Sequence, residues 1–395
     1  GARILREFLK QLKWRPRLER IAFVSDSIWP YNKGGKEKRL DEITKRIVKD
    51  GRQVDVYTMK WWDGPKHIIN PNGVHLHAIT KFRPLYKNDR RSIGEAVLFA
   101  LSCWKLIFRR FDTVDVDSMP FFPLFIVRIV CWLRRKKMNA TWHEVWGAAY
   151  WRKYLGGVSG LIGALVEIMA LKTPDLIVSN SDHTTARLRA VGIKKQIATV
   201  PLGVDVDRIL TIPAHDFVSD IIFVGRLLEN KNVNMLIDAV SLVKAKMPDI
   251  RCLVVGEGPE RGRLEQQVQD LQLSDNITFF NFVEDHDELY SLMKASKMLV
   301  QTSTREGFGL VIVEANACGI PVVTTAHEHN AGRDLIVEGQ NGYLTQPDAR
   351  SLAVQIRKIL KRSTLLKPAK TLEEQFGKYR WSEVAQEVER ILATS

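Results

Sequence analysis

The stretch "KMLVQTSTREGFGLVIVEANACGIPVVTT" (297–325) predicts the fold of this chain. Its apolar start, 297–303, reads as a strand, and a helix fits 309–318 after a glycine turn. Gly319 then ends the helix before a second apolar strand at 320–325. Both strands are apolar on two faces, as in a parallel sheet that helices cover on each side. The stretch is therefore typical of an α/β fold.

The same alternation of apolar strands and helices runs through most of the 395 residues. In the first half, strands are expected at 20–26, 53–59, 74–79, 113–119, 139–145, 175–180 and 197–203, with helices at 37–50, 93–110, 122–136, 159–173 and 182–191. The second half restarts the pattern, with strands at 220–226, 251–258, 276–283, 297–303 and 320–325 and helices at 233–246, 259–271, 286–296, 309–318 and 349–361. Two open α/β sheets in succession predict two Rossmann-like domains.

The weakest pattern lies at 204–217, where we expect the linker between the domains. The first domain is then residues 1–205, and the second is residues 206–378. The last segment, 379–395, reads as an amphipathic helix that we expect to pack back on the first domain.

Composition and charge bound the function. The chain is 45% hydrophobic and 26% charged, which fits a globular protein with a sizeable core. Its net charge of +14 favours anionic partners, namely nucleic acid, anionic lipid or phosphorylated ligands. The four cysteines form no Cys-x-x-Cys pair, which favours buried free thiols in a reducing compartment. The first residues are too charged for a signal peptide, and no apolar run reaches the ~20 residues that span a bilayer.

Two acids, Glu306 and Glu314, flank the glycine turn of the opening stretch. Open α/β sheets bind ligands at the carboxyl ends of their strands, and a helix that begins near Gly309 aims free amides toward that edge. Glu314 lies ~7 Å from the helix start, since a helix rises ~1.5 Å per residue. This spacing suits a nucleotide, with the diphosphate at the amides, ribose hydroxyls at Glu314, and a sugar near Glu306. The alternative is an ordinary loop acid and a helix-surface acid.

Two further segments place charge and glycine at strand ends. In "FVGRLLENKN" (223–232), Arg226 follows a strand and Lys231 comes shortly after it. These cations could stabilise a departing diphosphate without a metal, or they are solvated surface charges. In "VVGEGPERGRL" (254–264), the Gly256-Glu257-Gly258 turn allows close approach of a base or phosphate, although Gly-x-Gly alone is weak evidence.

These pieces, followed by "CGIPVVTT" (318–325), resemble the retaining glycosyltransferases of family 4. The resemblance is strongest over 218–345 and implies the GT-B fold, in which two Rossmann-like domains face a deep interdomain cleft. It implies that Glu306 contacts the transferred sugar or the phosphate, that Glu314 binds ribose, and that Arg226 and Lys231 hold the diphosphate. The amides near Phe308, Gly309 and Leu310 would complete the phosphate cradle.

The first domain offers two more candidates. In "SIWPYNKGGKEKRL" (27–40), Gly34 and Gly35 resemble the glycine loop that faces the donor phosphate and the acceptor in this family, although a plain strand-to-helix turn is nearly as good an explanation. His143 ends the strand in "TWHEVWG" (141–147), where family members often carry a histidine near the sugar. The chain departs from the family at Leu202, where an asparagine is usual, and this departure bears on the acceptor pocket and the identity of the sugar.

Basic and apolar residues gather in the first domain. Residues 4–17 have apolar side chains at helical spacing among Arg and Lys, which favours a membrane or interdomain contact. Segments 95–111 and 121–137 join apolar bulk to basic clusters, and buried Rossmann helices are the favoured interpretation over membrane-surface helices. A lipid-linked acceptor would explain the charge. We therefore expect a cytoplasmic protein that is peripheral at the cytoplasmic face of an anionic membrane.

The expected function is transfer of a hexose-type sugar, with retention, from a UDP- or GDP-sugar to a hydroxyl of a membrane lipid or lipid-linked glycan. No cofactor or metal is expected, because Asp115/Asp117 fall within a strand pattern and Asp205/Asp207 at a strand end and linker. No carboxylate qualifies as a nucleophile, which favours front-face attack. The alternatives are a nucleotide-sugar epimerase or phosphorylase on this fold, and a non-catalytic protein that binds membrane or nucleic acid, although no nucleic-acid motif is visible.

Overall fold

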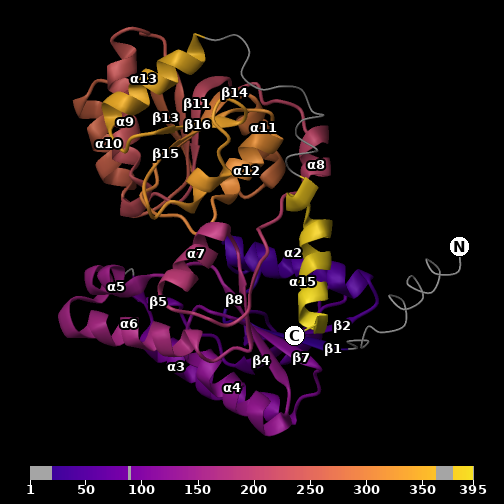
Figure 1. Cartoon of the computed structure of the whole chain (residues 1–395). Coiled ribbons are helices and arrows are strands. Elements are labelled where there is room, and N and C mark those ends of the chain that lie inside the picture. The colour runs from indigo at the N-terminus through magenta and orange to yellow at the C-terminus, as the bar shows by residue number, and fades with distance from the viewer. Residues whose placement is uncertain (1–19, 88–89, 362–376, 395) are drawn as a thin grey trace, which may run out of the picture. The chain divides into compact units, whose positions relative to one another are not determined.

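The computed structural model describes residues 20–87, 90–361 and 377–394, and the described chain forms two compact units (Figure 1). The first unit contains the residues up to Asn180, Thr184–Pro201 and the chain from Trp381 onward. The second contains Ser181–His183 and Leu202–Arg380. The amphipathic segment 4–17 lies outside the described residues.

The first unit is built on an eight-stranded sheet of order β10-β9-β8-β7-β1-β2-β4-β3. Its strands are β1 (Arg20–Val24), β2 (Gln53–Met59), β3 (His67–Ile69), β4 (His75–Thr80), β7 (Thr113–Asp117), β8 (Lys137–Trp142), β9 (Leu176–Ser179) and β10 (Ile197–Thr199). All pairs in this sheet are parallel except β3 with β4 at the edge. A short separate ribbon pairs β5 (Tyr86–Lys87) with β6 (Arg90–Arg91).

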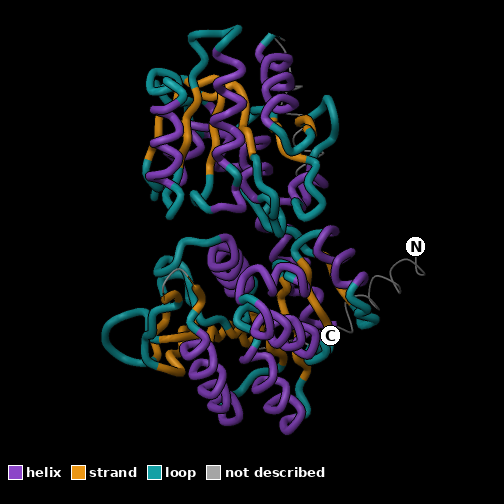
Figure 2. The backbone as a smooth tube through the Cα atoms, turned by 90° about the vertical axis from the view of Figure 1, so that its left-hand side faces the viewer, coloured by secondary structure: helices purple, strands orange, loops and turns teal. Residues whose placement is uncertain are grey.

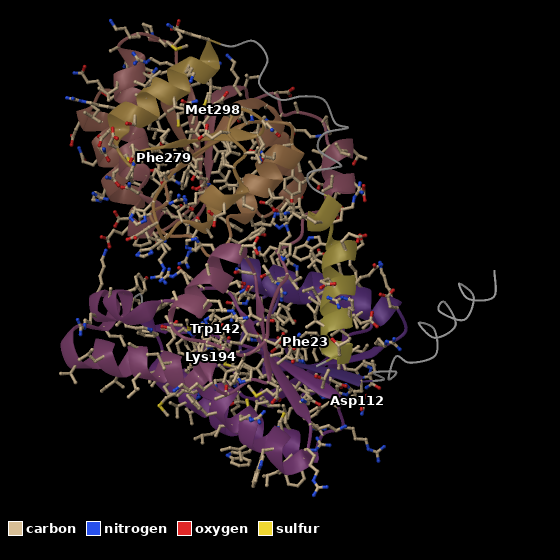
Figure 3. All side chains as sticks on the ribbon, viewed as in Figure 1. Phe23, Asp112, Trp142, Lys194, Phe279 and Met298 are labelled. Carbon is tan, nitrogen blue, oxygen red and sulfur yellow. The ribbon has the colours of Figure 1, made fainter. Side chains whose placement is uncertain are left out.

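Helices cover both faces of this sheet. The helix α15 (Trp381–Thr394) packs on α2 (Gly35–Lys49), as the amphipathic pattern of the last segment predicts. On the opposite face lie α3 (Ile93–Ser102), the 3₁₀ helix η1 (Cys103–Phe108), α4 (Phe122–Arg134), α5 (Gly147–Leu155) and α6 (Gly157–Leu171) (Figure 1). The helix α7 (Asp182–Ala190) leads from β9 to β10. Figure 3 labels Phe23 and Trp142, which are buried in this unit.

The second unit has a wholly parallel six-stranded sheet of order β13-β12-β11-β14-β15-β16. Its strands are β11 (Ser219–Val224), β12 (Cys252–Val255), β13 (Ile277–Phe280), β14 (Ser296–Gln301), β15 (Val322–Thr325) and β16 (Gly342–Thr345). The helices α9 (Val233–Lys244), α10 (Arg261–Asp270) and α13 (Ala349–Leu360) pack together over a core that includes Met298. The helices α11 (His286–Lys294) and α12 (Leu310–Ala317) also pack on each other. Figure 2 shows strands enclosed by helices in this unit.

Several elements differ from the sequence-based expectation. The antiparallel strand β3 is new, because Asn70 accepts from the amides of Asn72 and Val74 and turns the chain back at Gly73 (φ 81°). The single helix expected at 93–110 ends at Ser102 and continues as η1. The helices α5 and α8 (Val206–Thr211) and the strand β16 have no clear apolar period in the sequence. No described helix is long and apolar enough to cross a membrane.

Candidate active site

The topology of the second sheet marks one place for a ligand. From β11 the chain passes through α9 to β12, on one side, while from neighbouring β14 it passes through α12 to β15, on the other. Ligands of open α/β sheets bind at such a switch point, beyond the carboxyl ends of the two strands. The segments that follow these strands are 225–232 and 302–309, and they carry most of the predicted site residues of this unit.

Hydrogen bonds join the two segments. The amide of Thr304 donates to the carbonyl of Asn230 (2.9 Å), and the hydroxyl of Thr302 donates to the carbonyl of Lys231 (2.8 Å). The ammonium of Lys231 forms an ion pair with Glu306, whose Oε1 also accepts from the Ser303 hydroxyl (3.0 Å). The structure therefore brings Lys231 and Glu306 together at the switch point.

Arg226 lies on the same segment, just beyond β11, and is exposed. Its guanidinium makes no ion pair or hydrogen bond with any described residue. The side chains of Lys231 and Glu306 are only about one-fifth exposed, at 19% and 21%. The two predicted diphosphate ligands thus differ: one cation is already paired, and the other has all of its donors available.

The glycine turn places backbone donors at the start of α12. Gly309 has φ +96°, in the left-handed region that favours glycine, and a Cβ there would lie 3.0 Å from the Cα of Gly332. The Phe308 side chain is buried against the ring of Tyr379 at a centroid distance of 6.0 Å, so only its backbone is available to a ligand. No described group accepts a hydrogen bond from the amides of Phe308, Gly309 or Leu310. Three adjacent amides are thus unsatisfied within the described chain at a helix N-terminus, which suits an anion.

Glu314 lies inside the second unit, with 4% of its surface exposed. Its Oε1 accepts from the hydroxyl of Tyr290 on α11 at 3.0 Å. Burial first, and then the neighbouring Glu314, raise the pKa of Tyr290, so its hydroxyl stays a donor. This contact fixes one face of the carboxylate, and no sequence motif points to Tyr290.

The glycines of the Gly256-Glu257-Gly258 turn have a packing role. A Cβ on Gly256 would lie 2.0 Å from the carbonyl oxygen of Gly225, and one on Gly258 would lie 2.3 Å from that of Leu227. The exposed Glu257 accepts from the amide of Leu227 through its carbonyl (2.8 Å). The close approach that we expected of a base or phosphate is made here by the chain itself, so the glycines need no ligand to explain them.

The first sheet has a switch point of its own, between β1 and β7, and charged residues meet there. The ammonium of Lys36, one residue after Gly35, lies 3.0 Å from Asp117 and 3.2 Å from Asp26. Burial lowers the pKa of Lys36, but Asp117 more than offsets this and the net pKa is raised. Asp26 is fully buried and also pairs with Arg91. Gly34 precedes α2, and a Cβ there would meet only the flexible end of Glu37.

His143 follows β8 at this same edge, with its Nε2 3.6 Å from Asp117. A small cavity of about 20 Å³, room for roughly one water, is lined by charged residues that include Arg39, Asp115, Asp117 and His143. Burial lowers the pKa of His143 to about 4, and Asp117 only partly opposes it. The imidazole is therefore neutral at neutral pH, with the aspartate and Lys36 beside it.

Neither Asp-x-Asp pair is an open pair of carboxylates. Asp115 accepts from the Thr141 hydroxyl (2.6 Å), and Asp117 pairs with Lys36. Asp205 caps α8, and Asp207 pairs with Arg380 (3.1 Å). All four cysteines are free thiols, and Cys318 alone is half-buried rather than buried.

Two family models match this chain over most of its length. "Glycosyltransferase Family 4" matches residues 33–208, and "Glycosyl transferases group 1" matches residues 215–379. The chain belongs to glycosyltransferase family 4. The resemblance read from Glu306, Glu314 and their neighbours is thereby confirmed at the level of the family.

Similar proteins extend this finding. The family 4 chain is 24% identical to the human protein of phosphatidylinositol N-acetylglucosaminyltransferase over 385 residues, which is 95% of this chain and 76% of that protein. It is 31% identical to the putative colanic acid biosynthesis glycosyltransferase WcaL of Salmonella typhimurium over 191 residues, 46% of this chain and 47% of the relative.

Solved structures confirm the GT-B fold. Sucrose-phosphate synthase from Thermosynechococcus elongatus superposes with a TM-score of 0.77 at 23% identity, covering 95% of this chain and 100% of that one. HepE of Anabaena, in complex with UDP and glucose, superposes with a TM-score of 0.72 at 20% identity and the same coverage. At these identities the likeness shows the fold alone.

Proposed function

We propose that this family 4 glycosyltransferase moves a hexose-type sugar, with retention, from a UDP- or GDP-sugar to a hydroxyl of a membrane lipid or lipid-linked glycan. The observation that carries the donor half is the switch point of the second sheet. There, Lys231, Arg226 and three unsatisfied amides lie at the ends of two neighbouring strands. A diphosphate needs such a set of positive groups, and the leaving group gains charge as the sugar–phosphate bond breaks.

The proposed roles follow from chemistry. The amides of 308–310 and Arg226 bind diphosphate oxygens, and Lys231 stabilises the charge that develops on the leaving phosphate. These groups can supply the positive charge that a metal would otherwise bring, so we propose metal-independent transfer. Glu306 contacts the sugar, Glu314 binds ribose, and neutral His143 hydrogen-bonds to the sugar from the first unit. With no carboxylate assigned as nucleophile, the leaving phosphate takes the proton of the acceptor in a front-face attack.

The donor is tested with nucleotides alone. UDP is tried first, because HepE has been solved with UDP, and GDP second; each should raise the melting temperature of the chain more than the corresponding monophosphate does. The Arg226→Ala variant should lose most of this shift, whereas Lys246→Ala, an exposed lysine after α9, should keep it. The absence of any shift with either diphosphate, or equal shifts in both variants, would remove the donor site from this edge.

An exposed apolar face in the first unit supports the acceptor half. The outer surfaces of α3, η1, α4 and α6 carry large apolar side chains, among them Phe108 (88% exposed), Trp132 (70%) and Ile162 (58%). The helices pack side by side on one face of the sheet (Figures 1 and 2). Their inner surfaces are buried core, as expected of 95–137, but this outer surface is not. Scattered exposed apolar residues are normal, whereas a set that spans adjacent helices marks an interaction site.

Charge at the ends of these helices favours an anionic lipid surface over a protein partner. Arg109 and Arg110 follow η1 directly, and Arg135 and Lys137 follow α4, and all four are exposed. Aromatic and aliphatic side chains beside cations suit the boundary between acyl chains and anionic headgroups. We propose that the enzyme lies on the cytoplasmic face of a membrane through this surface. Its human relative is named for phosphatidylinositol, which supports a lipid acceptor.

Flotation with vesicles tests this surface. Binding to vesicles of phosphatidylcholine with phosphatidylglycerol should exceed binding to pure phosphatidylcholine and should fall with salt. The Trp132→Ser/Phe108→Ser double variant should bind several-fold more weakly. A control, Val354→Ser on α13 of the second unit, removes a similarly exposed apolar side chain (54%) and should bind as wild type. Equal binding by all three proteins would exclude this face.

A further inference from the structure

Three histidines meet at the edge of the first sheet. His67 begins β3, and His75 and His77 lie two residues apart on β4. In the antiparallel pair, His67 is opposite His77. Residues two apart on a strand, and residues directly opposite across a ladder, share one face of a sheet. All three imidazoles therefore project from the same face, and each offers a nitrogen within 4.8 Å of the others.

The spacing of two of these nitrogens matches a metal site. His67 Nε2 lies 3.3 Å from His75 Nδ1. In a tetrahedral zinc site with Zn–N bonds of ~2.0–2.1 Å, ligand nitrogens are separated by about 3.3 Å. The His67 and His77 rings stack with centroids 4.4 Å apart and an interplanar angle of 9°, so the His77 nitrogen must turn toward the ion. Since His67 is exposed and the other two are half-buried, the rings have room to turn.

An acidic neighbour supports the third ligand. Asp55 on β2 lies 2.6 Å from Nε2 of His77, and its other oxygen is held by Arg20 at 3.1 Å. Ligating histidines commonly donate their second nitrogen to a carboxylate, which fixes the tautomer and raises ligand basicity. With Nε2 of His77 donating to Asp55, Nδ1 is the nitrogen left to bind a metal. The Tyr57 ring stacks on His77 at 4.9 Å and limits its tilt.

We propose that His67, His75 and His77 bind a divalent transition metal, with Zn²⁺ the best fit to three imidazoles and an open fourth position. The ligands come from two strands, so the ion would fasten edge strand β3 to β4. They lie toward the amino end of β4, whereas the sugar-transfer site uses the carboxyl ends of the strands; the proposed metal is therefore structural and independent of the proposed reaction.

The protonation state of the cluster agrees with a ligand role. Burial, and then the two neighbouring histidines, lower the pKa of His67, which favours the neutral imidazole that binds metals. Without a metal, the same contact is a hydrogen bond between two neutral rings, and the experiment must separate these cases.

The test is a titration of the untagged, EDTA-treated full chain with Co²⁺, followed by visible absorption, and with Zn²⁺ in competition. We expect one ion per chain, displaced by Zn²⁺, with an intense tetrahedral spectrum. The variants His67→Ala and His75→Ala should each bind at least ~10-fold more weakly, and Asp55→Asn about 10- to 100-fold more weakly, the usual cost of losing a partner beyond the ligands.

The matched control is His327→Ala/His329→Ala, which removes the neighbouring histidines of the second unit (ring centroids 5.6 Å apart) and should leave the spectrum unchanged. Zn²⁺ should also raise the melting temperature of wild type and the control but not of His75→Ala, and circular dichroism verifies that each variant is folded. No Co²⁺ spectrum, or an unchanged affinity in His67→Ala, would overturn the proposal. UDP binding by the same samples reports on the donor site separately.

Discussion

His143 gives a prediction whose size follows directly from its surroundings. Burial, opposed by Asp117 and reinforced by Arg39 and Lys36, lowers the pKa of His143 from 6.5 to about 4. The difference, 6.5 − 4, is 2.5 units, and at ~1.36 kcal/mol per unit it corresponds to about 3 kcal/mol. As pH falls from 6.5 to 4, the unfolded chain binds a proton here that the folded chain refuses. This residue therefore costs stability on acidification and costs nothing above its unfolded pKa.

A neighbour acts in the opposite direction. Burial raises the pKa of Asp115 from 3.8 to about 6, despite its hydrogen bond from Thr141. The folded state takes up that proton first, so Asp115 adds stability as pH falls through 6 and on toward 3.8. The two residues nearly cancel in wild type, and pH dependence of the unmodified protein cannot reveal either one.

The substitution His143→Gln isolates the histidine, because glutamine has similar size and cannot be protonated. The free energy of unfolding of the variant minus that of wild type should become more positive by about 2–3 kcal/mol between about pH 7 and about pH 4.5. Urea denaturation at each pH measures this difference, in which the Asp115 contribution cancels to first order. Nuclear magnetic resonance of the ring gives the pKa directly. A ring that titrates near 6.5, or a pH-independent difference, would show that His143 is hydrated and that the cluster is assigned wrongly.

Three further changes test the second unit. Gly258→Ala places a Cβ 2.3 Å from the carbonyl of Leu227 and should lower the free energy of unfolding by about 1–3 kcal/mol in urea, whereas Gly262→Ala, which meets nothing within 4 Å, should not lower it. Glu314→Ala should weaken UDP or GDP binding in calorimetry, while Glu306→Ala should chiefly lower turnover; wild-type rates in both would remove these acids from the site. Lys231→Ala should lower turnover about 100-fold, since one preorganised contact to developing charge contributes ~3 kcal/mol, and full activity in a transfer assay would exclude it.

Much of the second unit could be predicted from the sequence, because its strands are short, apolar and separated by clear helical periods. The segments around β14, α12 and β15 agree with their predicted positions to within two residues. The position of Glu306 after a strand followed from that pattern. Its partner Lys231 did not, because the ion pair depends on β11 and β14 being neighbours, and strand order is not written in local periodicity.

The first unit was harder to read for the same reason. Lys36 follows the glycines that drew attention, yet a lysine on an amphipathic helix looks like a solvated charge until Asp117 is placed beside it by the pairing of β1 with β7. His75 and His77 read as polar residues alternating on a strand. Only the antiparallel return of β3 brings His67 to them, and no apolar period predicted that short strand.

The two cations of the second unit are suited to different tasks. An ammonium has three donors, so Lys231 can keep Glu306 and still reach a phosphate oxygen, and the carboxylate then holds the lysine in place before the donor binds. Arg226 has no such partner among the described residues, so its five donors are free to grip two oxygens at once. Glu306 also opposes a full positive charge at Lys231 until negative charge builds on the leaving phosphate. By this reasoning Arg226 contributes mainly to donor affinity and Lys231 mainly to turnover, so Arg226→Lys should raise the KM for the donor far more than it lowers kcat.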